Sequence, residues 1–220
     1  MADEIELEEL ELLDGAFADL RAFGVELTLE EGWFPRVLIG LLNATLREYQ
    51  HLKLGLRQSA AMVAWACRNL LELHIYARYV LASESNARRF VTERLNDGIE
   101  TCDAFQTWLA RNDPELVPPG LDEALRLLVD ERADTGLAEA PPLKLKRVAA
   151  EVGLADEYAN MTRLSAKLSH PNAFSILAEG GADDSGAMKP ILFRAGAGHG
   201  LEIFRAIKEH TAGFGVQPKP

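Results

Sequence analysis

The segment 58–82 constrains the fold of this 220-residue chain more than any other segment, because its helical wheel has no polar face. At about 100° of rotation per residue, alanine, valine, leucine, methionine and aromatic side chains surround the helix axis on every side. A helix that is apolar all round is normally buried inside a protein. The segment therefore predicts a helix at the centre of a bundle, with other helices packed around it.

The rest of the chain predicts further helices, because apolar residues recur at helical spacing between segments that glycine or proline interrupts. Gly55 is expected to break the chain just before the central helix. We expect an all-α bundle of six to eight helices that forms one domain over 1–215. The expected helices cover approximately 3–22, 33–54, 58–82, 85–112, 121–134, 143–152, 156–169 and 199–213.

Three parts of this expected domain differ in character. An acidic N-terminal helix, 3–22, precedes the core bundle of 33–170. The C-terminal part, 173–213, begins with two short apolar runs that flank the turn-rich stretch 180–186. This pattern predicts a small hairpin or ordered loop near 173–196, followed by the last helix.

The net charge of −11 disfavours non-specific binding to nucleic acid or to an anionic membrane. Eight acidic residues and no basic residue precede Arg21, which is unlike a secretory signal. The longest apolar stretch, 59–81, contains too many polar and charged side chains for a membrane span. We therefore expect a cytoplasmic protein without a membrane segment, in which Cys67 and Cys102 are reduced thiols.

No group of cysteines and histidines has the spacing of a zinc site, and no glycine-rich phosphate loop is present. The sequence therefore predicts neither a metal ion nor a cofactor.

The central helix nevertheless contains polar residues, and their spacing predicts how they pair. Arg68 and Glu72 are four residues apart on one face, so we expect them to form a structural ion pair inside the bundle. His74 is six residues from Arg68, which corresponds to about 600° of rotation. A regular helix therefore cannot direct Arg68 and His74 at the same atom of a substrate.

A second polar cluster lies in the expected helix 156–169 and at its end. The candidate members are Tyr158 and Ser165, whose hydroxyls can reach a neighbouring helix, and His170. His170 precedes a proline at the end of the helix, where the helix dipole favours its charged form. It is either a capping residue or a catalytic acid–base.

These residues carry a resemblance to a known family. Arg68-x-x-x-Glu72 in a buried helix, followed about ninety residues later by Tyr158, Ser165 and His170-Pro171, resembles a bacterial all-helical family of unknown function. The resemblance covers roughly 55–175, and it implies that the helix with the Arg–Glu pair packs near the end of the helix that carries His170.

The chain also resembles the HEPN superfamily, helical domains that often cleave RNA in toxin and antiviral systems. The signature of that superfamily is Arg, usually a polar residue, and then His after four to six intervening positions, which Arg68, Asn69 and His74 match. The resemblance implies that these three residues act in metal-independent RNA cleavage, in a site that a homodimer completes. Because the helical wheel separates Arg68 from His74, His170 is our preferred catalytic histidine if activity exists.

Two functional hypotheses follow. The first is a HEPN-like ribonuclease with an RNA substrate, in which histidine is the acid–base and arginine stabilises the phosphorane. The second is a non-catalytic sensor or partner-binding module of a bacterial stress or defence system, whose acidic N-terminal helix docks a basic protein partner. We favour the second hypothesis because the negative net charge opposes RNA binding. Whether Arg68 is free for a ligand or paired with Glu72 distinguishes the two.

Overall fold

The structure of the chain is a computed structural model. It describes residues 5, 7–28, 30, 32–113, 115, 118, 120–136, 141–169 and 188–212. His170, Pro171 and the turn-rich stretch 180–186 lie outside these residues.

The described residues form eight α-helices and no strand, which confirms the predicted all-α bundle. The helices are α1 (Leu7–Leu27), α2 (Trp33–Gln58), α3 (Ala60–Ala82), α4 (Glu84–Asn112), α5 (Leu121–Asp134), α6 (Leu145–Glu151), α7 (Ala155–Ser169) and α9 (Met188–Ala212).

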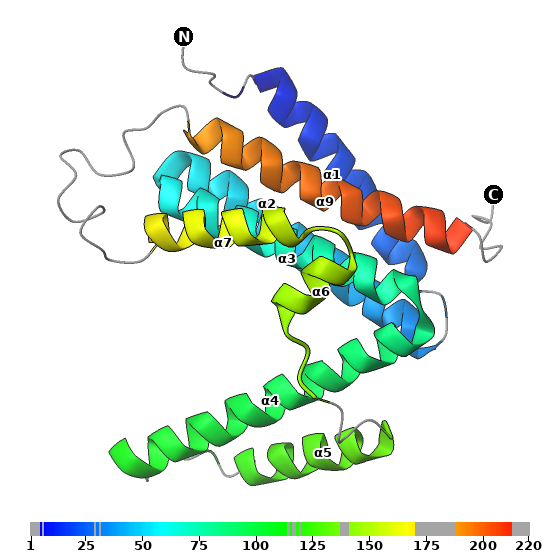
Figure 1. Cartoon of the computed structure of the whole chain (residues 1–220), viewed down its shortest axis with the longest axis vertical. Coiled ribbons are helices and arrows are strands. Elements are labelled where there is room, and N and C mark those ends of the chain that lie inside the picture. Colours follow the sequence, from blue (N-terminus) through cyan, green and yellow to red (C-terminus); the bar gives the residue numbers. More distant parts are fainter. Residues whose placement is uncertain are drawn as a thin grey trace. The chain divides into compact units, whose positions relative to one another are not determined.

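The described helices divide into two compact units. The first unit comprises Met1–Leu81 and Leu145–Pro220, and the second comprises Ala82–Lys144. In the first unit α2 packs against both α1 and α9, α1 also contacts α9, and α6 contacts α7. Figure 1 shows α9, drawn in orange to red, against α1 and α2. The single domain over 1–215 stays a prediction.

The helix α3 is the buried centre of the first unit, as its apolar wheel predicts. Twelve of its 23 residues are buried, more than in any other described helix. They include Leu70, Leu71 and Ile75, whose side chains have no exposed surface. One edge of α3 is nevertheless open, because Trp65 keeps 43% of its surface exposed.

Glycines allow two helices to approach α3 closely. A Cβ atom on Gly55 would lie 2.8 Å from the backbone nitrogen of Val63, so α2 and α3 meet there without room for a side chain. A Cβ atom on Gly196 of α9 would lie 3.1 Å from Cα of Cys67. Contrary to our expectation, Gly55 therefore does not break the chain. It lies inside α2, which continues to Gln58, and its role is this close approach.

The second unit is a hairpin of α4 and α5, which Figure 1 shows side by side. Its apolar core is small: α4 buries three apolar residues, Ala87, Leu95 and Leu109, and α5 buries none. Polar contacts supplement this core. Arg94 forms an ion pair with Glu131 at 2.8 Å, and Gln106 donates a hydrogen bond to Asp122 at 2.6 Å.

The expectation for 173–196 needs a partial correction. Residues 188–196, in which we expected one arm of a hairpin, are the first turns of α9, and 173–187 lie outside the described residues. The apolar run Ile191-Leu192-Phe193 lies in this helix with one side chain facing solvent and two facing the core: Ile191 is exposed, while Leu192 and Phe193 are buried. A short apolar run has no periodicity of its own, so it fits a strand and a buried helix equally well.

Candidate functional site

The polar residues of α3 that the sequence singles out lie on two different sides of the helix. Arg68 Nε donates a hydrogen bond to Glu72 Oε1 at 2.8 Å. The two side chains keep 32% and 23% of their surface exposed, so the pair lies at the open edge of α3 and not in the core. Our expectation of a buried pair is therefore corrected. The physical reason is that both residues share the edge with Trp65, which the described helices leave uncovered.

This position changes the expected contribution of the pair to stability. We expect Glu72→Ala to lower the free energy of unfolding by about 0.5–1 kcal/mol, since solvent screens a partly exposed pair. A fully buried pair would instead cost about 3–5 kcal/mol when one partner is removed. Urea denaturation of Glu72→Ala and of the double variant Arg68→Met/Glu72→Leu measures the difference. Glu84→Ala, which breaks the exposed Arg88–Glu84 pair of α4, is the matched control. A loss above about 3 kcal/mol for Glu72→Ala would show that the pair behaves as buried.

Asn69, the polar residue that follows Arg68, contacts a buried carboxylate on α2. Its Nδ2 donates a hydrogen bond to Glu48 Oε2 at 3.0 Å. Only 7% of the Glu48 side chain is exposed, and its oxygens also lie 3.2 Å from His51 Nδ1 and 3.4 Å from Arg47 Nε. Three donors therefore compensate for the burial of this charge, and the network joins α2 to α3.

Glu48 and His51 are not among the residues that the sequence singles out. A signal for Glu48 exists in the sequence, because Glu48 falls within a run of helical core positions that also contains Thr45, Tyr49 and Leu52. A carboxylate in such a run needs partners, but its spacing does not identify them.

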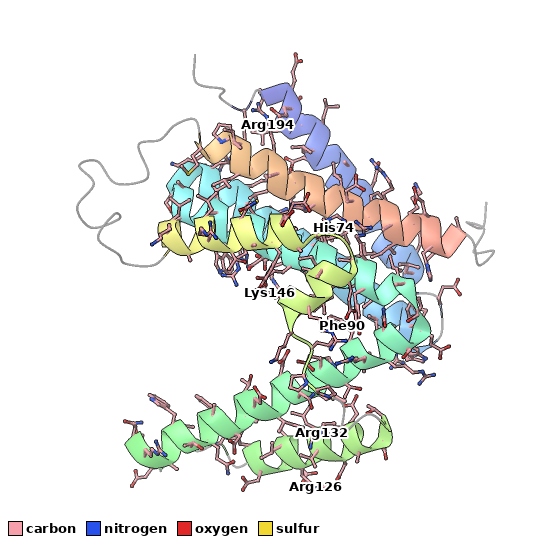
Figure 2. All side chains as sticks on the ribbon, in the orientation of Figure 1. His74, Phe90, Arg126, Arg132, Lys146 and Arg194 are labelled. Carbon is pink, nitrogen blue, oxygen red and sulfur yellow. The ribbon has the colours of Figure 1, made fainter. Side chains whose placement is uncertain are left out.

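His74 lies on another side of α3 and pairs with a histidine of α9. The Nδ1 atoms of His74 and His199 are 3.2 Å apart, so one imidazole donates a hydrogen bond from Nδ1–H and the other accepts it at Nδ1. Burial, together with the nearby His199 and Arg78, lowers the pKa of His74 to about 4. Burial also lowers the pKa of His199, although Glu157 and Glu202 oppose this shift. Both imidazoles are therefore neutral near pH 7. Figure 2 labels His74 on α3.

The structure does not bring together the residues of the predicted HEPN-like motif. Arg68 bonds to Glu72, Asn69 bonds to Glu48, and His74 bonds to His199. This separation follows from the rotation between positions 68 and 74 along a regular helix.

The second predicted cluster is only partly described. On α7, Tyr158 is half-buried, and the buried Ser165 donates a hydrogen bond from Oγ to the backbone oxygen of Thr162 at 3.2 Å. His170 lies outside the described residues, so the grouping of Tyr158, Ser165 and His170 stays a prediction.

Within the part of the chain that the structure describes, no group of three or more His, Cys, Asp or Glu side chains could hold a metal ion. Both cysteines are free. Burial raises the pKa of Cys67 to about 12, so this thiol is protonated and is a poor nucleophile. Among the described helices, none is long and apolar enough to cross a membrane.

No protein-family model matches the chain, and neither a curated protein nor a solved structure matches it. The two family resemblances therefore rest only on the residues quoted for them.

Proposed function

We propose that the chain is a non-catalytic helical module that acts as a sensor or binds a protein partner. The observation that carries this proposal is the pairing of Arg68 with Glu72, because a catalytic arginine would have to meet the substrate. Asn69 and His74 are also engaged with side chains of the same chain. The acidic N-terminal helix, now α1, is the docking surface in this proposal.

The protonation state of His74 supports the same conclusion. A general acid–base works best when its pKa is near the working pH, whereas the pKa of His74 lies at about 4. Its Nδ1 is also occupied by His199. The net charge of −11 opposes the approach of a polyanion. The resemblance to a bacterial family supports a bacterial source, and the resemblance to the HEPN superfamily supports a place in a stress or defence system. A cytoplasmic location is part of the same proposal.

A HEPN-like metal-independent ribonuclease is the second candidate, and one observation favours it. His51 Nδ1 lies 3.2 Å from the buried Glu48, and a carboxylate on one imidazole nitrogen orients the other nitrogen as a base. The His51 side chain is partly exposed, and its ring lies 5.4 Å from that of the exposed Trp65. In this candidate function a homodimer completes the site.

Incubation of the purified chain with single-stranded RNA in EDTA tests the two candidates. We expect wild type to leave the RNA intact, even at concentrations that permit dimerisation. Cleavage that leaves 2′,3′-cyclic phosphate ends would contradict the proposal and favour the nuclease. In that case His51→Ala, His74→Ala and His170→Ala would identify the catalytic histidine, provided that the inactive variant keeps the thermal stability of wild type.

A further inference from the structure

The helix α1 has one face that no other described helix covers. Its buried residues, Phe17, Leu20 and Leu27, point into the first unit. The opposite side, which we call the α1 outer face, consists of exposed residues: Leu7, Glu8, Glu11, Leu12, Gly15, Ala18, Asp19, Ala22, Val25 and Glu26. At about 100° per residue these positions occupy a single continuous face.

Contacts with α2 and α9 hold α1 firmly in place. Glu9 accepts two hydrogen bonds from Arg194 of α9, both at 2.8 Å. Figure 2 labels Arg194 close to α1. Asp14 bonds to Lys53 of α2 at 2.6 and 2.7 Å and accepts a hydrogen bond from Tyr49. Desolvation alone would raise the pKa of Asp14, but the bonds from Lys53 and Tyr49 outweigh it and lower the pKa. The α1 outer face is therefore presented by an anchored helix.

The large apolar side chains of the α1 outer face are unusually exposed. Leu7, Leu12 and Val25 keep 72%, 76% and 63% of their surface exposed. Between them lie small residues, and a Cβ atom on Gly15 would meet no atom within 4 Å. A strip of small residues between larger apolar ones allows a second helix to pack at a short interaxial distance.

The charges of the α1 outer face all have one sign. Glu8, Glu11, Asp19 and Glu26 are acidic, and the basic residue Arg21 lies about 110° from the middle of the face. The same face of a second copy would meet this charge with an equal negative charge, and nucleic acid or an anionic membrane would also be repelled. A surface that combines exposed apolar side chains with negative charge is complementary to a basic and partly apolar partner.

We propose that the α1 outer face docks a basic amphipathic helix of a partner protein. This proposal rests on the proposed function and specifies the partner. The apolar stripe of the partner helix packs over Gly15, Ala18 and Ala22, between the large apolar side chains. Its lysines or arginines lie opposite the four carboxylates.

A synthetic helical peptide with a leucine stripe flanked by lysines serves as the probe, and its binding to the full chain is measured by fluorescence anisotropy. A peptide of the same composition in scrambled order controls for charge alone. We expect Leu12→Ser/Val25→Ser to weaken binding about tenfold or more, because both side chains lose apolar contact. Ile191→Ser is the matched control, since Ile191 of α9 is 61% exposed and lies outside this face.

The charge of the face is tested separately. Glu8→Gln/Glu11→Gln should weaken binding and reduce its dependence on salt, whereas Glu209→Gln on α9 should not. Equal binding of the scrambled peptide, or wild-type affinity of Leu12→Ser/Val25→Ser, would overturn the proposal. Sedimentation velocity tests the alternative that a second copy of the chain covers this face. If wild type is a dimer and Leu12→Ser dissociates it, the proposal is overturned in favour of that alternative. Cleavage of RNA would refute the non-catalytic function but would leave this peptide measurement unaffected, so the two failures are distinguishable.

Discussion

Acidification from pH 7 to about pH 4.5 should reduce the free energy of unfolding by about 2–3 kcal/mol through His74 alone. His74 is 8% exposed, and burial is the main reason why its pKa in the folded chain is about 4. The His199 imidazole and the Arg78 guanidinium also disfavour a positive charge there. Glu157 and Glu202 act in the opposite direction on His199.

The sign of the effect follows from linkage. The pKa of a histidine in the unfolded chain is about 6.5, so below that pH the unfolded chain binds a proton that the folded chain rejects. The stabilisation from neutral His74 is therefore fully present above about pH 6.5. It is lost as the pH falls from there through the folded-state pKa of about 4.

Urea denaturation of wild type and His74→Gln at both pH values isolates this contribution. Wild type should lose about 2–3 kcal/mol more than His74→Gln between the two, because glutamine does not titrate. The comparison cancels the effect of Asp14 and Glu9, whose lowered pKa values also destabilise the fold in acid. Equal losses in the two proteins would show that His74 is not held neutral by the fold.

The fold could be predicted from the sequence because its strongest signal, the all-round apolar segment 58–82, has only one stable solution in water. A helix of that kind must be surrounded, and the amphipathic segments on either side supply the surrounding helices. The start of α9 at Met188 could not be predicted, because its first turns contain a short apolar run that has no clear period. The role of Gly55 could not be predicted either, because its close approach to Val63 is a packing contact that the presence of a glycine does not reveal.

The candidate site was predictable only where its partners are near in sequence. Arg68 and Glu72 lie one helical turn apart, and their bond follows from that spacing. The partner of His74 is 125 residues away, and the partner of Asn69 is 21 residues away on the preceding helix. Such pairs depend on how α2, α3 and α9 pack. The exposed fraction of a side chain also depends on which helices pack beside it. The spacing of Arg68 and Glu72 therefore predicts their bond but not their position at the edge of the bundle.

Substitution by alanine at three glycines near the middle of α9 should change the stability of the protein in different directions, with a gain at one position and a loss at the other two. Gly196, Gly198 and Gly200 all lie within the helix, where alanine is favoured over glycine by about 0.5–1 kcal/mol. A Cβ atom on Gly198 would have no atom within 4 Å. We therefore expect Gly198→Ala to stabilise the protein by about 0.5–1 kcal/mol.

Gly200→Ala should instead destabilise the protein by about 1–3 kcal/mol, because its methyl group would overpack the core. A Cβ atom at this position would lie 2.7 Å from Phe17 Cζ and 3.0 Å from Phe17 Cε1. The Phe17 ring has little room to move, because it is buried and stacked on the fully buried Tyr49 ring with centroids 3.7 Å apart.

Gly196→Ala meets a different obstacle. Its Cβ atom would lie 3.1 Å from the backbone Cα of Cys67 and equally close to Leu52 Cδ2, so α9 would have to move away from α3. We expect a loss of about 1–3 kcal/mol here as well. Urea denaturation of the three single variants measures these changes against one another, with Gly198→Ala as the control for helix propensity. If Gly200→Ala and Gly196→Ala were as stable as Gly198→Ala, α9 could not pack against α1 and α3 as closely as these distances require.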